Sequence, residues 1–269
     1  MKAEARFISF REGRLAETSV RLDLIADQEG WFAISKPPGI GLVFDPWQAG
    51  KIDLVSALRT EIGTGKHQLA VLGIVAPSAI NRLDVDESGL AIVAKNETAS
   101  AALKNLLGSS GLKMTYELLG AAPVGASVLE CSLPLSRHRE QQRVVVSHRS
   151  GKIASTTFRR IESFGSVSRW EAKTFYSRIH QIRIHAAESG LGILGERLYR
   201  SVPLVYMSHL KRRFRRSGKP ERPIYGHIAL HLRRIEVRLP DQEPTMVEAP
   251  LPRGYAVLIK QLRRFSTES

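Results

Sequence analysis

The sequence is poor in cysteine, in aromatic residues and in long apolar runs. Cys131 is the single cysteine among 269 residues, which excludes a disulfide framework and a cysteine-rich zinc site and favours a reducing compartment. The longest apolar run, residues 69–76, is far shorter than the roughly 20 residues that cross a bilayer. The N-terminal segment lacks the continuous apolar stretch of a secretory signal. We therefore expect a cytoplasmic protein that is neither secreted nor inserted in a membrane.

Several motifs of common enzyme classes are also absent or out of context. The sequence contains no G-x-S-x-G, no P-loop and no H-E-x-x-H, so common hydrolase and NTPase chemistry has no support. GLGILG at 190–195 matches G-x-G-x-x-G, but it follows a predicted helix rather than a strand. It therefore predicts a helix end and a turn, not a nucleotide cofactor. His227 and His231 are four residues apart, but their segment alternates like a strand and no third ligand is evident, so we expect no metal site.

The charge distribution is the strongest signal in the composition. Forty Lys and Arg against 26 Asp and Glu give a net charge of +14. Residues 1–134 carry 13 basic and 15 acidic side chains, whereas residues 135–269 carry 27 basic and 11 acidic ones. Such asymmetry is typical of proteins that bind nucleic acid, because neutralising phosphates releases counterions. Since aromatic residues make up only 7% of the chain, we expect a groove along the nucleic-acid backbone rather than a multi-base stacking platform.

The densest basic segment is residues 211–222, with seven basic residues and one acid. We predict an exposed loop or helix end there. A solvated basic face is the ordinary interpretation of such a segment, but the charge asymmetry of the whole chain favours contact with phosphates. The residues of this segment that we expect to bind nucleic acid are Lys211, Arg212, Arg213, Arg215 and Arg216.

Local patterns predict an α+β protein with a largely antiparallel sheet. Period-two alternation or short apolar runs predict strands at 31–35, 89–95, 113–120, 155–164, 168–175 and 227–239. Apolar residues at helical spacing predict helices at 53–62, at 96–107 and after residue 177. Asp53, Asn96 and Ser177 are the predicted N-caps of these helices.

In three segments, a polar residue lies at a position where core packing alone does not explain it. Asp84 lies in a loop just before the apolar strand at 89–94, and Tyr116 lies within the predicted strand 113–120. Arg183 lies at the edge of an apolar helical stripe, within reach of an interior carboxylate. Each has an ordinary interpretation when taken alone: a turn aspartate, a half-buried sheet tyrosine and a surface arginine.

Taken together, these segments resemble the RluA-type pseudouridine synthases. That family shows H-R-L-D-x-x-T-S-G-L, then K-x-Y, then G-R-T-H-Q-I-R-x-H followed by G-x-P-I-L-G-D. This chain has N-R-L-D-V-D-E-S-G-L at 81–90, M-T-Y at 114–116, S-R-I-H-Q-I-R-I-H at 177–185 and G-L-G-I-L-G-E at 190–196. K-P-P-G at 36–39 resembles the family's N-K-P-x-G, and 229–237 resembles its late L-H-A-x-x-L-x-F strand. The resemblance spans residues 25–240 in the family's order.

The resemblance implies the pseudouridine synthase fold, a mixed and mainly antiparallel sheet with flanking helices and a central basic cleft. It implies a catalytic domain at 25–245, preceded by an extension at 1–24 and followed by one at 246–269 that packs on it. The implied activity is isomerisation of a uridine in ribosomal or transfer RNA, without a cofactor or metal. We expect a monomer.

The resemblance also assigns roles to residues. Asp84 matches the catalytic aspartate, Tyr116 the tyrosine that stacks on the target base, and Arg183 the arginine that pairs with the aspartate. A stacked uridine is out of reach, so the target base must flip into a pocket with an aromatic face. Arg82 matches an arginine that helps to hold the RNA with this base extruded. The residues expected to contact RNA in these motifs are Arg82, Arg178 and His180.

Three positions depart from the family pattern. Asn81 replaces its histidine, Glu87 its threonine, and Met114 the lysine two residues before the tyrosine. Glu87 also brings the acids within residues 84–87 to three, and their mutual repulsion opposes an ionised Asp84. A second interpretation therefore stays open: a non-catalytic RNA-binding relative that acts as an RNA chaperone or assembly factor. The sequence does not choose between a nucleophilic and a proton-accepting aspartate.

Overall fold

The computed structural model describes residues 7–48, 50–121, 124–211, 214 and 218–266. These residues form two compact units. Unit 1 contains the residues up to 114 together with 175–179 and 232–250, and unit 2 contains 115–174, 180–231 and the residues from 251 onward. Two strands, β6 (Leu112–Ala121) and β13 (Leu230–Val237), each contribute to both units. Each unit is thus assembled from segments that are distant in the sequence.

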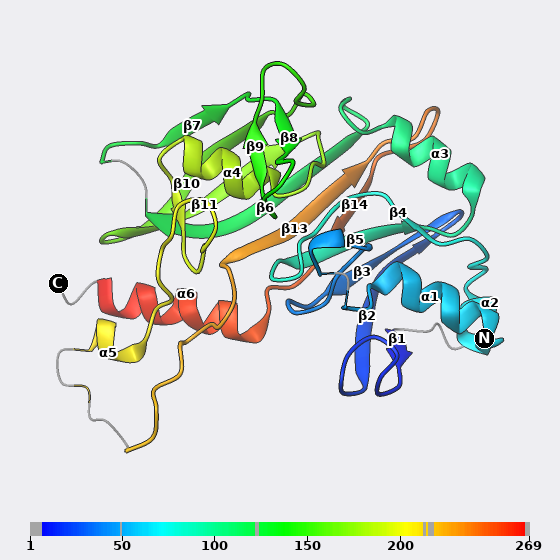
Figure 1. The fold of residues 1–269 in the computed structure, drawn as a ribbon, viewed down its shortest axis with the longest axis horizontal. Helices are drawn as coiled ribbons and strands as arrows, with labels where there is room; N and C mark the ends of the chain where they lie inside the picture. Colours follow the sequence, from blue (N-terminus) through cyan, green and yellow to red (C-terminus); the bar gives the residue numbers. More distant parts are fainter. Residues whose placement is uncertain (1–6, 49, 122–123, 212–213, 215–217, 267–269) are drawn as a thin grey trace. The chain divides into compact units, whose positions relative to one another are not determined.

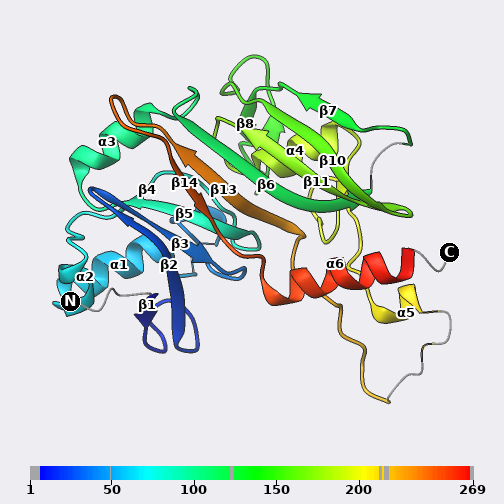
Figure 2. The ribbon, with the colours of Figure 1, turned by 180° about the vertical axis from the view of Figure 1, so that it is seen from behind.

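Unit 1 contains the strand order β1, β2, β3, β5, β13, in which β1, β2, β3 and β5 pair antiparallel, each with the next. Beside β5 lies β4, and beside β13 lies β14 (Figure 2). The bounds are β1 (Phe7–Phe10), β2 (Val20–Gln28), β3 (Trp31–Lys36), β4 (Ser78–Ala79), β5 (Ser88–Ala94) and β14 (Thr245–Glu248). The register of β3 and β5 pairs Lys36 with Gly89. It therefore brings the end of β3 next to the loop that precedes β5.

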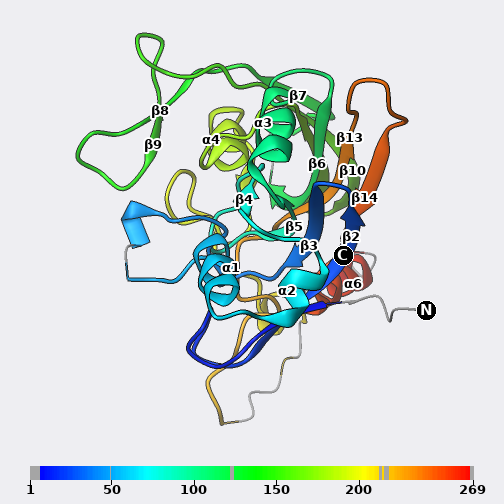
Figure 3. The ribbon, with the colours of Figure 1, turned by 90° about the vertical axis from the view of Figure 1, so that its right-hand side faces the viewer.

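The helical segments of unit 1 are the short 3-10 turn η1 (Pro46–Gln48), α1 (Leu54–Gly63), α2 (His67–Val71) and α3 (Glu97–Asn105). Of these, α1 and α3 begin where the sequence predicts, whereas η1 and α2 were not predicted. Asp53 caps α1 by accepting a hydrogen bond from Ser56 N at 2.9 Å, and Asn96 caps α3 through Ala99 N at 2.9 Å. Both predicted caps are confirmed. In Figure 3, α1 and α3 lie on one face of this sheet.

Unit 2 contains the strand order β6, β11, β10, β7, with β12 beside β6 and a separate two-stranded ribbon of β8 and β9. The strand bounds are β7 (Val128–Cys131), β8 (Leu135–Arg137), β9 (Val144–Val146), β10 (Thr156–Phe164), β11 (Val167–Thr174) and β12 (Gly192–Ile193). The helices are α4 (Gln181–Glu188), α5 (Met207–Leu210) and α6 (Arg253–Ser266) (Figure 1).

Strand alternation places α4 and α6 on opposite faces of the unit 2 sheet. In β11, Thr174 accepts a hydrogen bond from Gln181 of α4 at 2.9 Å, whereas Arg169 pairs with Glu117 of β6 at 2.7 Å. Positions 169 and 174 differ by an odd number, so their side chains point to opposite faces. Leu119, which shares the face of Glu117, packs in the core cluster that includes α6. By the same alternation, the even-numbered residues of β6 face α4.

The α4 helix begins later than predicted. It starts at Gln181, after His180 in a left-handed conformation with φ of 53°, and no side chain caps it. Ser177 is therefore not its N-cap; the Ser177 hydroxyl instead accepts a hydrogen bond from Arg82 N at 2.7 Å. The predicted strands are present within one to three residues of their expected bounds. Among the described residues, no helix has the length and hydropathy needed to cross a membrane.

Candidate active site

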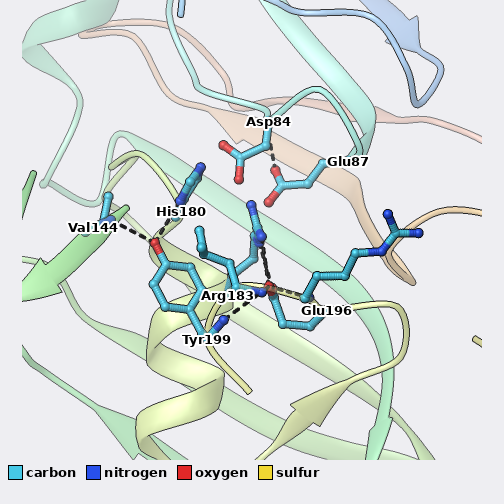
Figure 4. A network of polar contacts seen from close by, with 9 residues as sticks. Asp84, Glu87, Val144, His180, Arg183, Glu196 and Tyr199 are labelled. Carbon is cyan, nitrogen blue, oxygen red and sulfur yellow. Dashed lines mark hydrogen bonds and ion pairs between the residues drawn. The ribbon is translucent and has the colours of Figure 1, made fainter. Parts of the chain in front are cut away.

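The Asp84 loop in unit 1 closes on itself through Glu87. Glu87 N donates to Asp84 O at 3.2 Å, and Asp84 N donates to the Glu87 carboxylate at 3.1 Å (Figure 4). Leu83 and Val85 on either side are buried, whereas Asp84 is partly exposed. The two flanking apolar side chains thus anchor the loop and leave the Asp84 carboxylate at its surface. Glu87 is only 5% exposed and acts as the acceptor that fixes the turn.

A buried ammonium group lies under this loop. Lys36 is fully buried, and its Nζ donates to four backbone carbonyls at 2.5–3.4 Å, those of Pro37, Ile40, Val85 and Glu87. Burial lowers the pKa of Lys36 from 10.5 to about 8, although the carboxylates of residues 84, 86 and 87 act to raise it. Lys36 is therefore mainly protonated at pH 7. Its positive charge offsets the mutual repulsion of the three acids at 84–87. In the sequence, the only sign of this role is that Lys36 begins the K-P-P-G motif.

Asn81 and Gly89 fix the two ends of the loop. The Asn81 side chain, 1% exposed, donates to Leu90 O at 3.0 Å and accepts from Ile92 N at 2.8 Å. Gly89 has φ of +128°, and a Cβ there would lie 2.4–2.7 Å from the backbone of Leu232. Glycine is therefore required at this point. At the position of the family histidine, Asn81 thus bonds to β5 through both its amide nitrogen and its amide oxygen.

In unit 2, Arg183 forms a buried bidentate ion pair with Glu196. Its Nε and Nη2 donate to the two carboxylate oxygens at 2.7 and 2.8 Å, and the Glu196 side chain is only 1% exposed. Glu196 Oε1 also accepts from the backbone N–H groups of Arg197 and Leu198 at 2.9 and 2.7 Å. Burial alone would raise the pKa of Glu196, but these donors outweigh it and lower the pKa. Glu196, the last residue of G-L-G-I-L-G-E, was not predicted as a site residue.

Tyr199 extends this arrangement. The Arg183 guanidinium lies 5.5 Å from the centroid of the Tyr199 ring. The Tyr199 hydroxyl accepts from Val144 N of β9 at 3.0 Å and is 2.7 Å from His180 Nδ1. Figure 4 shows the Tyr199 hydroxyl between His180 and Val144, with Arg183 and Glu196 on the other side of the Tyr199 ring's attachment to the chain. His180, expected to contact RNA, is 8% exposed and turned toward Tyr199.

Tyr116 shares a sheet face with the helix that carries Arg183. It is an even-numbered residue of β6, so it points to the α4 side, and it is 4% exposed. Unit 2 thus brings Tyr116 and Arg183 to one face, whereas Asp84 belongs to unit 1 with Lys36. Met114 is completely buried in β6.

The structure describes part of the expected RNA-binding set. Arg82 is exposed, Lys211 is exposed directly after α5, and Arg178 is half-buried with its guanidinium 5.8 Å from the Tyr176 ring centroid. The remaining residues of the basic segment, Arg212, Arg213, Arg215 and Arg216, lie outside the described residues. Within the described part of the chain, no group of three or more His, Cys, Asp or Glu residues could hold a metal ion.

Comparison with known proteins identifies the family. Residues 32–188 match the family model described as RNA pseudouridylate synthase. The chain belongs to the RNA pseudouridylate synthase family. It is 27% identical to ribosomal large subunit pseudouridine synthase D of Pseudomonas aeruginosa, over 94% of this chain and 75% of that protein. It is 31% identical to the protein of that name from Haemophilus ducreyi, over 94% of this chain and 74% of that protein.

A solved structure supports the pseudouridine synthase fold. Human RNA pseudouridylate synthase domain containing 4 superimposes with a TM-score of 0.65 at 17% identity, covering 89% of this chain and 92% of that one. The predicted family and the mixed, mainly antiparallel fold are confirmed. The chain is an RNA pseudouridine synthase, and therefore an isomerase that acts on RNA.

Proposed function

We propose that this pseudouridine synthase isomerises a uridine of ribosomal RNA, with Asp84 as the catalytic carboxylate. The assignment rests on one observation: buried Lys36 donates hydrogen bonds to the carbonyls of Val85 and Glu87 and thereby holds the Asp84 loop in place. Relatives named ribosomal large subunit pseudouridine synthase D favour ribosomal RNA over transfer RNA as the substrate. We keep the expectation of a cytoplasmic monomer with its catalytic region at 25–245.

The reaction needs a fixed, ionised carboxylate. The C1′–N1 bond of uridine breaks, the base turns, and C1′ bonds to C5, while the proton on C5 leaves and N1 gains one. No atom is added overall, so no co-reactant is consumed. The carboxylate serves either as nucleophile or as proton acceptor, and both roles require its ionised form. The Lys36 ammonium favours that form, because it is the positive charge beneath a loop of three acids.

The residues of unit 2 complete the proposed machinery. We assign Arg183 as the partner of the Asp84 carboxylate and Tyr116 as the aromatic surface for the extruded base. Glu196 acts as a positioning residue, because its two hydrogen bonds fix the plane of the Arg183 guanidinium. Arg82, Arg178 and Lys211, together with the basic segment at 211–216, would hold the RNA backbone.

Asp84→Asn tests the assignment. Pseudouridine is mapped in total RNA from a strain that lacks the protein and from the same strain complemented with the wild type, Asp84→Asn or Asp86→Asn. Asp86 is an exposed acid of the same loop, so Asp86→Asn is the matched control. We expect a ribosomal RNA site to be lost in the deletion and restored by the wild type and Asp86→Asn, but not by Asp84→Asn.

Two outcomes contradict the proposal. If Asp84→Asn restores every site, Asp84 is not catalytic, and the RNA chaperone or assembly role becomes the better interpretation. If the dependent site lies in transfer RNA, the ribosomal substrate is wrong while the catalytic assignment stands.

A further inference from the structure

The described residues that lead from β3 to α1, at 43–48 and 50–52, include two exposed apolar side chains. Phe44 is 61% exposed and Ile52 is 48% exposed. The short turn η1 inside this segment buries none of its residues. About half of the surface of each apolar side chain is therefore open to solvent.

Hydrogen bonds fasten the base of this segment to the catalytic loop. Gly39 N donates to Val85 O at 2.7 Å, and Lys36 Nζ bridges Ile40 O and Val85 O. On its other side, Leu54 N at the start of α1 donates to Gly41 O at 2.9 Å. The segment thus projects from the framework that holds Asp84.

The projecting part is also ordered internally. Asp45 Oδ1 accepts from Trp47 N at 3.0 Å, Asp45 O accepts from Gln48 N at 2.8 Å, and Gln48 O accepts from Lys51 N at 2.9 Å. A side chain on such a pre-formed turn loses little conformational freedom when it binds a ligand. Phe44 directly precedes this turn and is exposed to solvent.

We propose that Phe44 stacks on an unpaired RNA base next to the target uridine. This inference rests on the proposed function, because it places the base beside the Asp84 loop. Two observations favour a nucleobase as the occupant. The chain belongs to a family that acts on RNA, and the backbone at 39–40 that leads to Phe44 is hydrogen-bonded to the Asp84 loop. Any base can stack on one aromatic ring, so Phe44 contributes to the affinity for RNA but not to the choice of RNA sequence.

Oligouridylate and abasic RNA separate stacking from charge. Fluorescence anisotropy measures the affinity of the full chain for a short single-stranded oligouridylate and for an abasic RNA of equal length, which keeps the phosphates but has no bases. Phe44→Ala should weaken oligouridylate binding by about 5- to 150-fold, the usual effect of removing one stacking partner. Its affinity for the abasic RNA should not change.

Two further variants make the test specific. Phe44→Trp keeps an aromatic face and should retain the affinity for oligouridylate. Met246→Ala removes a side chain of similar exposure, 59%, from β14 of the same unit, and it should bind both RNAs like the wild type. Unchanged oligouridylate binding by Phe44→Ala, or equal losses for both RNAs, overturns the stacking role.

Turnover separates this inference from the proposed function. Single-turnover formation of pseudouridine is measured on a large-subunit ribosomal RNA transcript. If Asp84→Asn is inactive while Phe44→Ala binds oligouridylate normally, the inference fails and the proposed function stands. If Asp84→Asn turns over normally, the catalytic assignment fails, and with it the placement of the stacked base beside a catalytic loop.

Discussion

The chain contains two Arg–Glu pairs of nearly identical geometry and different burial, both in unit 2. Arg183 and Glu196 are joined by hydrogen bonds of 2.7 and 2.8 Å, and so are Arg263 and Glu162. The side chains of the first pair are 14% and 1% exposed, and those of the second are 56% and 29% exposed. Substituting the carboxylate in each pair therefore compares a buried ion pair with an exposed one.

We expect Glu196→Gln to lower the free energy of unfolding by about 3 kcal/mol, the lower end of the range for removing one partner of a buried ion pair. Glutamine keeps the shape and one acceptor oxygen, but it leaves the buried Arg183 guanidinium without a countercharge at Glu196 and removes one acceptor from the backbone donors of Arg197 and Leu198. Glu162→Gln should change stability little, because water and salt screen an exposed pair.

Urea unfolding of both variants at pH 7 and at low pH tests this reasoning. The pKa of Glu196 in the folded protein lies below its ordinary value of 4.5. Its stabilising effect is therefore complete well above pH 4.5 and is lost as the pH falls through the folded-state pKa. The difference between wild type and Glu196→Gln should shrink accordingly. Equal losses from Glu196→Gln and Glu162→Gln at pH 7, or a difference that does not respond to acid, would refute it.

Two further predictions concern the Asp84 loop. Because the pKa of Lys36 falls from 10.5 to about 8 on folding, the unfolded state binds more protons between these values and stability rises there with pH. At 1.36 kcal/mol per pKa unit, the free energy of unfolding should rise by about 3 kcal/mol. Lys36→Met should lack this rise in urea unfolding from pH 7.5 to 10.5. The same rise in the variant as in the wild type would contradict the burial of the ammonium. Asn81→Leu leaves Leu90 O and Ile92 N without their partner, so it should lower the free energy of unfolding by about 2–4 kcal/mol in thermal unfolding. A loss of stability no larger than that of Glu162→Gln would show that water replaces the amide.

Features that depend on neighbouring residues were predictable from the sequence. The Asp53 and Asn96 caps bond three residues away along the chain, so their signal is local. Ser177 shows the limit of this reasoning. Its residue type and position also suggest a cap, but its hydroxyl bonds to Arg82 N, 95 residues away. A tertiary partner thus overrode a local preference that was correct elsewhere.

The site was predictable as a set of motifs but not as a set of interactions. Lys36 and Glu196 lie inside the quoted motifs, yet their importance depends on burial and on carbonyl and guanidinium partners that spacing does not reveal. Glu87 and Asn81 were read as departures that weaken the site. In the structure both are buried and bonded, because a substituted residue can satisfy the same turn with a different acceptor.

The division of the chain between the units has a consequence for protein synthesis. Unit 1 takes residues 232–250 from near the C-terminal end of the sequence, and β13 is the neighbour of β5 on the side away from β3. A nascent chain that has not reached residue 232 therefore holds β5, an entirely buried strand, with the start of one edge uncovered. Asn81 and β4 already bond to residues 90–94 of that edge, but Gly89 lacks the Leu232 backbone that lies against it in the folded protein. Such an edge can pair with other chains, so ribosome-bound intermediates and truncated products of this chain should need a chaperone for longer than a protein whose units are contiguous.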